Sequence, residues 1–260
     1  MKLLFGSALL LLVACNNAED KATNTMPGAY KMISNSAKND KMDTTVLDGV
    51  QMKIYTEDYM MYANVNPADS VSAFGIGSYS VDKDTVTENV IFNAWDSAVG
   101  NPGTFKLIIE KTDKGYKQVI NNMTMNNGDA FQMTEDYQSV GTDSKSALDG
   151  AWKMTKRMII SGTDTTDVSS TQYKTFYAGH VIWGHTWTDS LNKTHTGMGF
   201  GTFTLNDNKL KESMTASTYA AVKGHDFDID ITMNGADGFT QTMANNDGTK
   251  SIEVYERMKK

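Results

Sequence analysis

Four histidines and a dense aromatic segment are the residues of this chain whose types could support metal or ligand chemistry. All four, His180, His185, His195 and His225, lie in the second half of the sequence. His180 and His185 are an odd number of residues apart, so a strand would place them on opposite faces. No second histidine-rich motif and no cysteine accompanies them in a spacing typical of zinc sites. The sequence therefore predicts no metal site.

The aromatic segment spans residues 178–187 and contains Trp183. If the strands around it enclose a cavity, Tyr173, Phe176, His180 and Trp183 would line a site for a small hydrophobic or amphipathic ligand, because such sites combine apolar walls with a few polar groups. If the interior is filled, the same side chains form a hydrophobic core. The sequence leaves both interpretations open.

Motifs that would indicate catalysis do not occur. The chain has no Gly-x-Ser-x-Gly, no phosphate-binding loop and no dinucleotide-binding glycine motif. Asp226, Asp228 and Asp230 lack the glycine and glutamate of a calcium loop and are expected on a solvent-facing side of a strand. We expect no catalytic residues, no cofactor and no enzymatic activity.

The N-terminus has the pattern of an export signal. Residues 1–14 carry Lys2 and then a short apolar run, too short to span a bilayer. The stretch Leu12-Val13-Ala14-Cys15 resembles the bacterial lipobox, which implies lipidation of Cys15, the only cysteine. Residues 15–27 are polar and suit a flexible tether.

Lipidation would anchor the protein to a membrane, because several acyl chains such as palmitate bind far more stably than one. Asn16 is not the aspartate associated with inner-membrane retention, which favours the outer membrane and leaves the leaflet open. The net charge of −7 argues against a nucleic-acid partner. No later window is apolar enough for a transmembrane helix.

An internal duplication predicts two domains. The segment Gly28-Ala-Tyr-Lys-Met32 recurs about 120 residues later as Gly150-Ala-Trp-Lys-Met154. Three further blocks repeat in the same order: residues 51–55 and 172–176, 75–79 and 199–203, and 115–118 and 238–241. We expect one ancestral unit copied in tandem, with domains at 28–141 and 148–260.

Each copy has the pattern of an all-β fold. Apolar and polar residues alternate along residues 226–233, as in a strand with one face in a core. Asn-Asp-Asn at 206–208 and Ala-Asp-Gly at 236–238 are typical of tight hairpins. About 110 residues with such turns suit an antiparallel barrel of about eight strands, or a comparable sandwich, in each copy.

The second copy resembles lipocalin-like domains of unknown function found in secreted bacterial proteins. Gly150-Ala-Trp152 is similar to the Gly-x-Trp motif of their first strand, and Arg257 stands where lipocalins place an arginine in the last strand. The resemblance covers residues 148–258 and implies that Trp152 and Arg257 pack together to close the barrel. Tyr30 and Ser139 replace them in the first copy, which indicates that this copy has diverged.

Two functions follow as alternatives. The resemblance favours a membrane-anchored binding protein that holds a small ligand in the second barrel without catalysis. The alternative is a structural or interaction module with filled barrels that contacts another protein of the cell envelope.

Overall fold

A computed structural model of the chain describes residues 26–47, 50–66, 72–95, 98–124, 127–245 and 247–260. The expected signal peptide, Cys15 and most of the tether lie outside these residues. The described part consists of strands and their connections. It contains no helix long and apolar enough to cross a bilayer.

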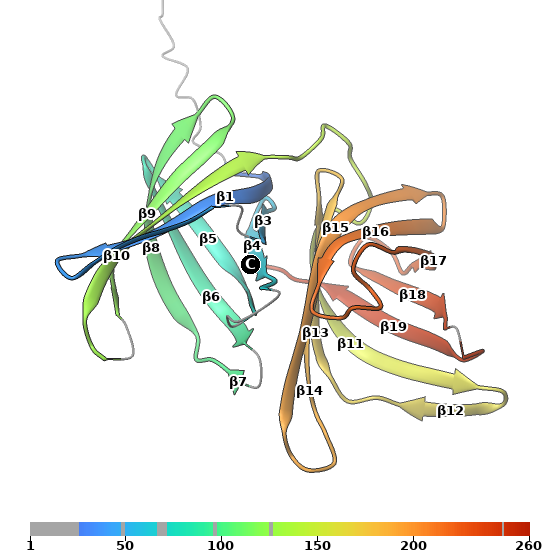
Figure 1. The fold of residues 1–260 in the computed structure, drawn as a ribbon. Coiled ribbons are helices and arrows are strands. Elements are labelled where there is room, and N and C mark those ends of the chain that lie inside the picture. Colours follow the sequence, from blue (N-terminus) through green and yellow to red (C-terminus); the bar gives the residue numbers. More distant parts are fainter. Residues whose placement is uncertain (1–25, 48–49, 67–71, 96–97, 125–126, 246) are drawn as a thin grey trace, which may run out of the picture.

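The first half of the chain forms one closed antiparallel barrel (Figure 1). Its eight wall strands are β1 (Gly28–Asn39), β3 (Gln51–Tyr55), β4 (Tyr59–Asn64), β5 (Ala73–Asp82), β6 (Thr85–Trp95), β8 (Gly103–Thr112), β9 (Gly115–Thr124) and β10 (Ala130–Ser139). Pairing of β10 with β1 closes the wall. The short strands β2 (Met42–Leu47) and β7 (Ala98–Val99) pair with the ends of β1 and β6.

The second half repeats this plan. Its wall strands are β11 (Gly150–Ser161), β13 (Thr171–Tyr177), β14 (His180–Thr188), β15 (Thr194–Asn206), β16 (Lys209–Ser217), β17 (Asp226–Met233), β18 (Gly238–Ala244) and β19 (Lys250–Arg257). The pairing of β19 with β11 closes the barrel, and β12 (Asp164–Asp167) extends β11. The prediction of an all-β fold with two tandem eight-stranded barrels is confirmed.

Tight turns connect neighbouring strands, as the hairpin between β13 and β14 shows. Ala178 and Gly179 have φ angles of 51° and 77°, the left-handed pair that a two-residue hairpin requires. A Cβ atom on Gly179 would lie 2.9 Å from the Thr142 hydroxyl of the connection between the barrels. Glycine at this position therefore serves both the turn and the close approach of the connecting segment.

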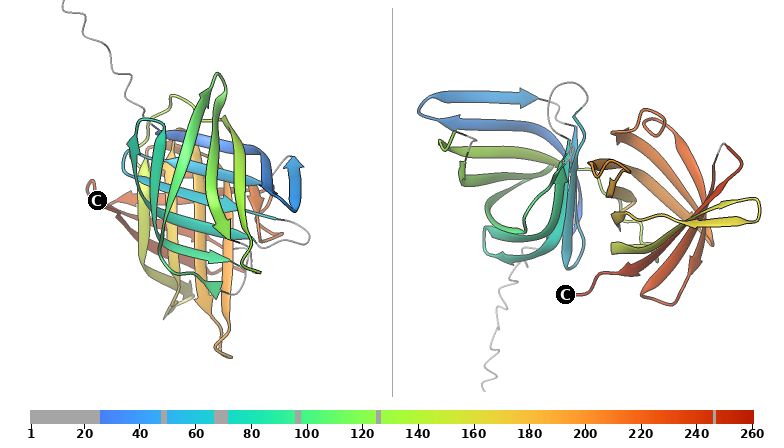
Figure 2. Two further views of the ribbon diagram at one scale, coloured as in Figure 1. Left: turned by 90° about the vertical axis from the view of Figure 1, so that its left-hand side faces the viewer. Right: turned by 90° about the horizontal axis from the view of Figure 1, so that it is seen from below.

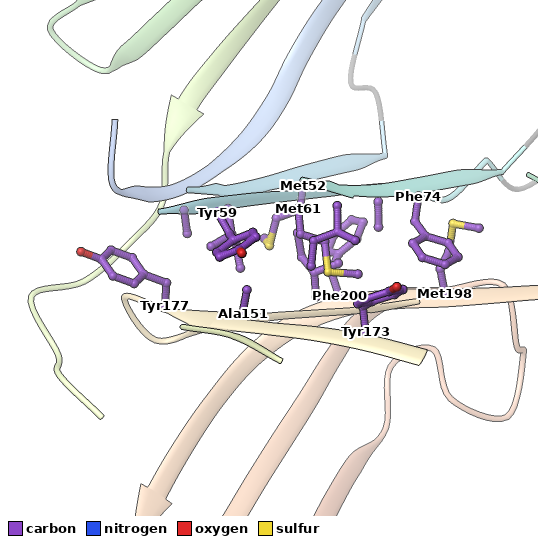
Figure 3. Close-up of a cluster of buried hydrophobic side chains, with 14 of the residues drawn as sticks. Met52, Tyr59, Met61, Phe74, Ala151, Tyr173, Tyr177, Met198 and Phe200 are labelled. Carbon is purple, nitrogen blue, oxygen red and sulfur yellow. The ribbon is translucent and has the colours of Figure 1, made fainter. Parts of the chain in front are cut away.

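The two barrels pack against each other through the outer faces of equivalent strands (Figure 2). A single buried cluster contains side chains of β3, β4 and β5 from one barrel and of β13, β14 and β15 from the other, among them Met52, Met61, Phe74, Tyr173, Ile182, Met198 and Phe200 (Figure 3). Met52 and Tyr173 occupy equivalent positions in the repeat, as do Phe74 and Met198. The contact is therefore made by the same face of both copies, in the manner of a two-fold symmetric dimer.

Polar contacts reinforce this interface between the barrels. The Thr175 hydroxyl lies 3.3 Å from the Met61 sulfur, and the Tyr177 hydroxyl donates to the Glu57 carboxylate over 2.8 Å. The Tyr59 hydroxyl donates to the carbonyl of Lys259 over 2.6 Å. The chain end after the last strand thus also fastens the second barrel to the first.

Trp152 and Arg257 meet at the closed end of the second barrel. The Arg257 guanidinium lies 4.0 Å from the centre of the Trp152 ring. Its Nη1 donates to the Asp149 carbonyl over 2.6 Å and its Nε to the Ala236 carbonyl over 3.0 Å, while the Trp152 indole donates to the Leu148 carbonyl over 2.7 Å. These contacts hold the connecting segment against the base of the barrel.

Removing this guanidinium should destabilise the second barrel. We expect Arg257→Ala to lower the unfolding free energy by about 2 kcal/mol, because a cation–π contact and hydrogen bonds to carbonyls are lost. This corresponds to a decrease in Tm of roughly 4–8 °C by calorimetry. Ser139→Ala, at the equivalent position of the first barrel, is the matched control and should leave Tm within about 1 °C. An unchanged Tm in Arg257→Ala would show that the barrel closes without this contact.

Candidate functional site

A layer of charged and amide side chains crosses the interior of the second barrel at mid-height. We call Gln172, Lys174, Glu212, Gln241 and Glu253 the polar layer; all five are buried. Lys174 Nζ donates to the Glu212 carboxylate over 2.7 Å and to the Gln241 amide oxygen over 3.1 Å. The Gln241 and Gln172 amide nitrogens donate to Glu253 over 2.8 and 3.0 Å. The layer is therefore a connected hydrogen-bond network rather than an isolated ion pair.

The first barrel contains the same network at the equivalent positions. Lys53 Nζ donates to Glu88 over 3.1 Å and to the Gln118 amide oxygen over 3.2 Å. Gln118 donates in turn to Glu135, which also accepts from the Tyr137 hydroxyl over 2.9 Å. Tyr255 repeats this last contact on Glu253 over 2.6 Å. Neither network was predicted from the sequence, although Gln51 and Lys53 recur as Gln172 and Lys174 in apolar strands of both copies.

The charge balance of the two layers differs at one position. Arg157 pairs across the strands with Glu253, and its Nε lies 3.5 Å from the Glu253 carboxylate. Asn35 stands at the equivalent place opposite Glu135, and its amide nitrogen lies 3.4 Å from that carboxylate. Burial raises the pKa of Glu135 despite the opposing effect of Lys53. Arg157 supplies the second barrel with a positive charge that the first lacks at this point.

Below the polar layer, the second barrel is packed with aromatic rings. The Phe176 ring makes an edge contact with Phe203 at 5.0 Å, and Phe239 stacks on Tyr255 at 4.7 Å and meets Trp152 at 4.8 Å. Phe176, Trp152 and Phe239 have less than 2% of their surface exposed. This end of the barrel is filled core.

Above the polar layer lies a cavity of about 180 Å³. Its floor is the polar layer, and its remaining lining consists of Arg157, Trp183, His185, Met214, Tyr219, Val222, Phe227, Ile229 and Met243. A cavity of about 150 Å³ is enough to hold benzene in another protein. The space therefore suits a molecule with one ring and a small substituent.

An aromatic cluster forms one side of the cavity and part of its entrance. Trp183 and His185 lie two residues apart on the inner face of β14, and Tyr219 comes from the connection between β16 and β17. The Tyr219 ring stacks on Trp183 with ring centres 6.0 Å apart, and its hydroxyl lies 2.7 Å from His185 Nε2. A Cβ atom on Gly197 would lie 2.2 Å from the Tyr219 oxygen and 2.5 Å from His185 Nε2. Glycine at 197 therefore leaves the space in which these two side chains meet.

Two polar atoms of the cavity lining are buried without a hydrogen-bond partner among the described residues. They are His185 Nδ1 and Arg157 Nε. Burial, together with the nearby Arg157 charge, lowers the pKa of His185 to about 4. His185 is therefore neutral at pH 7, and burial also raises the pKa of Tyr219 to about 12, so its hydroxyl stays protonated.

The four residues expected to line a ligand site occupy four different environments. Trp183 lines the cavity. Phe176 faces the interior but lies below the polar layer, in the filled core. Tyr173 is on the outer face of β13, in the interface between the barrels, where it meets Phe92 of the first barrel at 5.2 Å (Figure 3). His180 lies at the start of β14, next to the hairpin, with Nδ1 3.1 Å from the Ala178 carbonyl.

These placements correct the expected arrangement. Tyr173 and Phe176 are an odd number of residues apart, and so are His180 and Trp183, so neither pair can share one face of a strand. The structure replaces Tyr173, Phe176 and His180 with His185, Tyr219 and Arg157 as neighbours of Trp183 in the cavity lining.

The remaining polar features lie outside the cavity. His195 Nε2 is 2.7 Å from the Asp189 carboxylate, and the His195 ring stacks on Trp187. Asp226, Asp228 and Asp230 are exposed on β17, where Asp226 pairs with Lys211 over 2.8 Å. Within the described ranges, no three histidine, cysteine or acidic side chains are grouped closely enough to hold a metal ion.

Comparisons with known proteins find distant similarity in structure but none in sequence. No family model matches this sequence, and no curated protein is significantly similar to it. A lipocalin-like protein from Bacteroides uniformis is similar in structure at 12% identity, with a TM-score of 0.30, over 44% of this chain and 100% of that one. A protein of unknown function from the DUF3598 family of Nostoc punctiforme covers 89% of this chain and 96% of its own at 12% identity and a TM-score of 0.26. The two closed eight-stranded barrels are consistent with tandem lipocalin-like domains of unknown function.

The depressed pKa of His185 predicts a specific dependence of stability on pH. The folded-state pKa of about 4 lies below the ordinary value of 6.5, so the unfolded chain binds an additional proton between these values. Wild-type stability should be complete above about pH 6.5 and should fall by about 1–3 kcal/mol from this residue as pH decreases toward 4.

Denaturation of the wild type and of His185→Gln at several pH values measures this contribution. We expect the stability difference between them to shrink as pH falls from 7 to 4, because glutamine does not titrate. His195→Gln, which removes a half-buried histidine outside the cavity, serves as the control. A constant difference between wild type and His185→Gln across this range would contradict a neutral, buried His185.

Proposed function

We propose that this protein is a membrane-anchored, lipocalin-like lipoprotein that binds a small hydrophobic or amphipathic molecule in its second barrel without catalysing a reaction. The single observation that carries this proposal is the cavity between the polar layer and the Trp183–His185–Tyr219 cluster. Its apolar and aromatic walls with a few oriented polar groups have the composition of small-molecule sites.

The difference between the barrels supports the choice of the second. Tyr62 pairs with Lys53 in the first barrel, and Trp183 pairs with the equivalent Lys174 in the second. Tyr62 therefore stands where the second barrel has Trp183. Pairing with Gln51 and Gln172 likewise places Asn64 where the second has His185. The aromatic cluster and Arg157 are thus features of the second copy built onto a shared framework.

The proposed absence of catalysis is supported by how the charged groups are used. Lys174 and Glu212 are bonded to each other, and Glu253 accepts from two amides and a phenol. These groups are occupied in holding the floor of the cavity. The alternative of an interaction module with filled barrels is less well supported, because the second barrel contains a cavity of about 180 Å³ above the polar layer.

The anchor and the address come from the sequence. A lipid on Cys15 followed by a polar tether would hold both barrels at a membrane surface, and Asn16 favours the outer membrane. An envelope protein is a further partner that this address would allow. No nucleic-acid partner is proposed, in keeping with the net charge of −7.

Native mass spectrometry of the full protein, purified gently from its own host, tests ligand binding. We expect a small-molecule adduct that disappears after extraction with organic solvent. Trp183→Ala should lose most of the adduct, because it removes the largest apolar wall of the cavity. Tyr62→Ala, the equivalent change in the first barrel, should retain it. A bare polypeptide mass before and after extraction, unchanged by incubation with lipid mixtures, would favour the interaction module.

Cell fractionation tests the anchor. Cys15→Ser should move the protein from the membrane pellet to the soluble fraction, because no acyl chain can be attached through a thioether to serine. Phase partitioning in detergent measures this shift. Retention of Cys15→Ser in the detergent phase would contradict lipid anchoring through this residue.

A further inference from the structure

The unpaired polar atoms of the cavity indicate what kind of ligand it takes. We infer that the second barrel selects an uncharged, single-ring molecule that carries a hydrogen-bond acceptor, such as an amide or ketone oxygen, which His185 and Arg157 bind together. This inference rests on the proposed ligand-binding function and deepens it.

The contact between Tyr219 and His185 determines which ring nitrogen of His185 carries the proton. The Tyr219 hydroxyl, which stays protonated, lies 2.7 Å from His185 Nε2. If tyrosine donates to Nε2, both atoms are satisfied and the imidazole proton must be on Nδ1. The opposite tautomer would leave the Tyr219 hydrogen and the Nδ1 lone pair both unused. The first arrangement pairs more groups, so Nδ1 is a hydrogen-bond donor.

Arg157 provides a second unpaired donor in the cavity lining. Its Nε carries a hydrogen, is buried, and makes no hydrogen bond within the described chain, although the Glu253 carboxylate is 3.5 Å away. Arg157 is close enough to His185 for its charge to lower the histidine pKa. Two unsatisfied donors therefore belong to neighbouring side chains of one small cavity. Buried donors without partners are costly, so a ligand that offers an acceptor gains affinity by satisfying them.

The charged groups around the cavity favour an uncharged ligand. Lys174 and Arg157 carry two positive charges, and Glu212 and Glu253 carry two negative charges. Because the cavity lining is balanced and His185 is neutral, a carboxylate ligand would lose its hydration without gaining an unpaired cation. A neutral acceptor avoids this cost. The walls formed by Trp183, Met214 and Ile229 accept the apolar ring.

The volume of the cavity limits the size of the ligand. A volume of about 180 Å³ admits one substituted ring and is too small to enclose a haem or a fatty acid. The closest environment in the first barrel has Asn64 and Asn35 at the places of His185 and Arg157. The two donors are therefore a property of the second barrel.

Three fluorinated probes of nearly equal size test the inference: 4-fluorotoluene, 4-fluorobenzamide and 4-fluorobenzoate. Fluorine NMR with the purified full protein, corrected by a detergent blank, gives a Kd for each. We expect 4-fluorobenzamide to bind at least about tenfold more tightly than either of the others, the effect of one or two hydrogen bonds to buried donors.

Substitutions locate the effect. His185→Phe keeps an aromatic ring in place but removes the donor, and should reduce the amide preference to about threefold or less while 4-fluorotoluene still binds. His195→Phe is the matched control, because it makes the same change in a histidine outside the cavity, and should preserve the preference. Arg157→Met should also reduce the preference.

Different failures have different meanings. Equal binding of 4-fluorotoluene and 4-fluorobenzamide would overturn the inference about the acceptor and leave the proposed ligand-binding function intact. Tightest binding of 4-fluorobenzoate would overturn the preference for an uncharged ligand. No binding of any probe would overturn the inference as a whole, and the mass spectrometry of the native protein would then decide the proposed function separately.

Discussion

The interaction on which the rest of this structure depends is the buried lysine–glutamate pair inside each barrel. Taking both charges out of water is costly, and the mutual attraction offsets that cost only when further hydrogen bonds satisfy the remaining donors and acceptors. Lys174 and Glu212 achieve this through Gln241, which passes the network on to Glu253. Four strands must therefore stand at fixed heights relative to one another, which defines the register of the barrel.

This network also divides the barrel into two halves with different roles. The polar layer forms the floor of the cavity, and one buried apolar cluster runs around it from Trp152 and Phe176 to Trp183 and Met214. Below, Phe176 and Phe239 fill the barrel, and the Trp152–Arg257 contact closes it. Above, the layer is a polar floor for an otherwise apolar cavity. The shared layer explains how the two copies can diverge at their open ends while keeping one framework.

The packing of the two barrels follows from the same duplication. The first barrel contributes the outer faces of β3, β4 and β5, and the second barrel contributes those of β13, β14 and β15. These strands are therefore buried on both faces, as β13 shows. Trp183 and Tyr219 belong to the interior cluster of the second barrel and not to the interface cluster. The first barrel thus supports the second through a large apolar contact rather than through its interior.

Much of this architecture could be predicted from the sequence. The repeated blocks and hairpin residues indicated two all-β barrels, and the Gly-x-Trp motif with Arg257 indicated the contact at the closed end. The lining of the cavity could not be predicted as well. In β13 every residue from Gln172 to Tyr177 is buried, so no alternation of polar and apolar residues shows which face is inside. Here the inward residues are Gln172, Lys174 and Phe176, and the apolar Tyr173 faces the other barrel.

Long-range partners account for the remaining omissions. Tyr219 comes from a connection with no strand pattern, and its role follows only from its contact with His185, 34 residues away. Arg157 reaches the cavity because β11 pairs with the last strand. Such contacts depend on barrel closure and are not encoded in local periodicity.

A crystal structure of the full protein under xenon pressure would show whether the second barrel holds an apolar cavity above the polar layer, because xenon enters small apolar cavities and scatters strongly. We expect a xenon atom in the second barrel beside Trp183, Met214 and Ile229, above an intact contact between Lys174 and Glu212. Side chains filling that space, with no xenon inside the barrel, would contradict it.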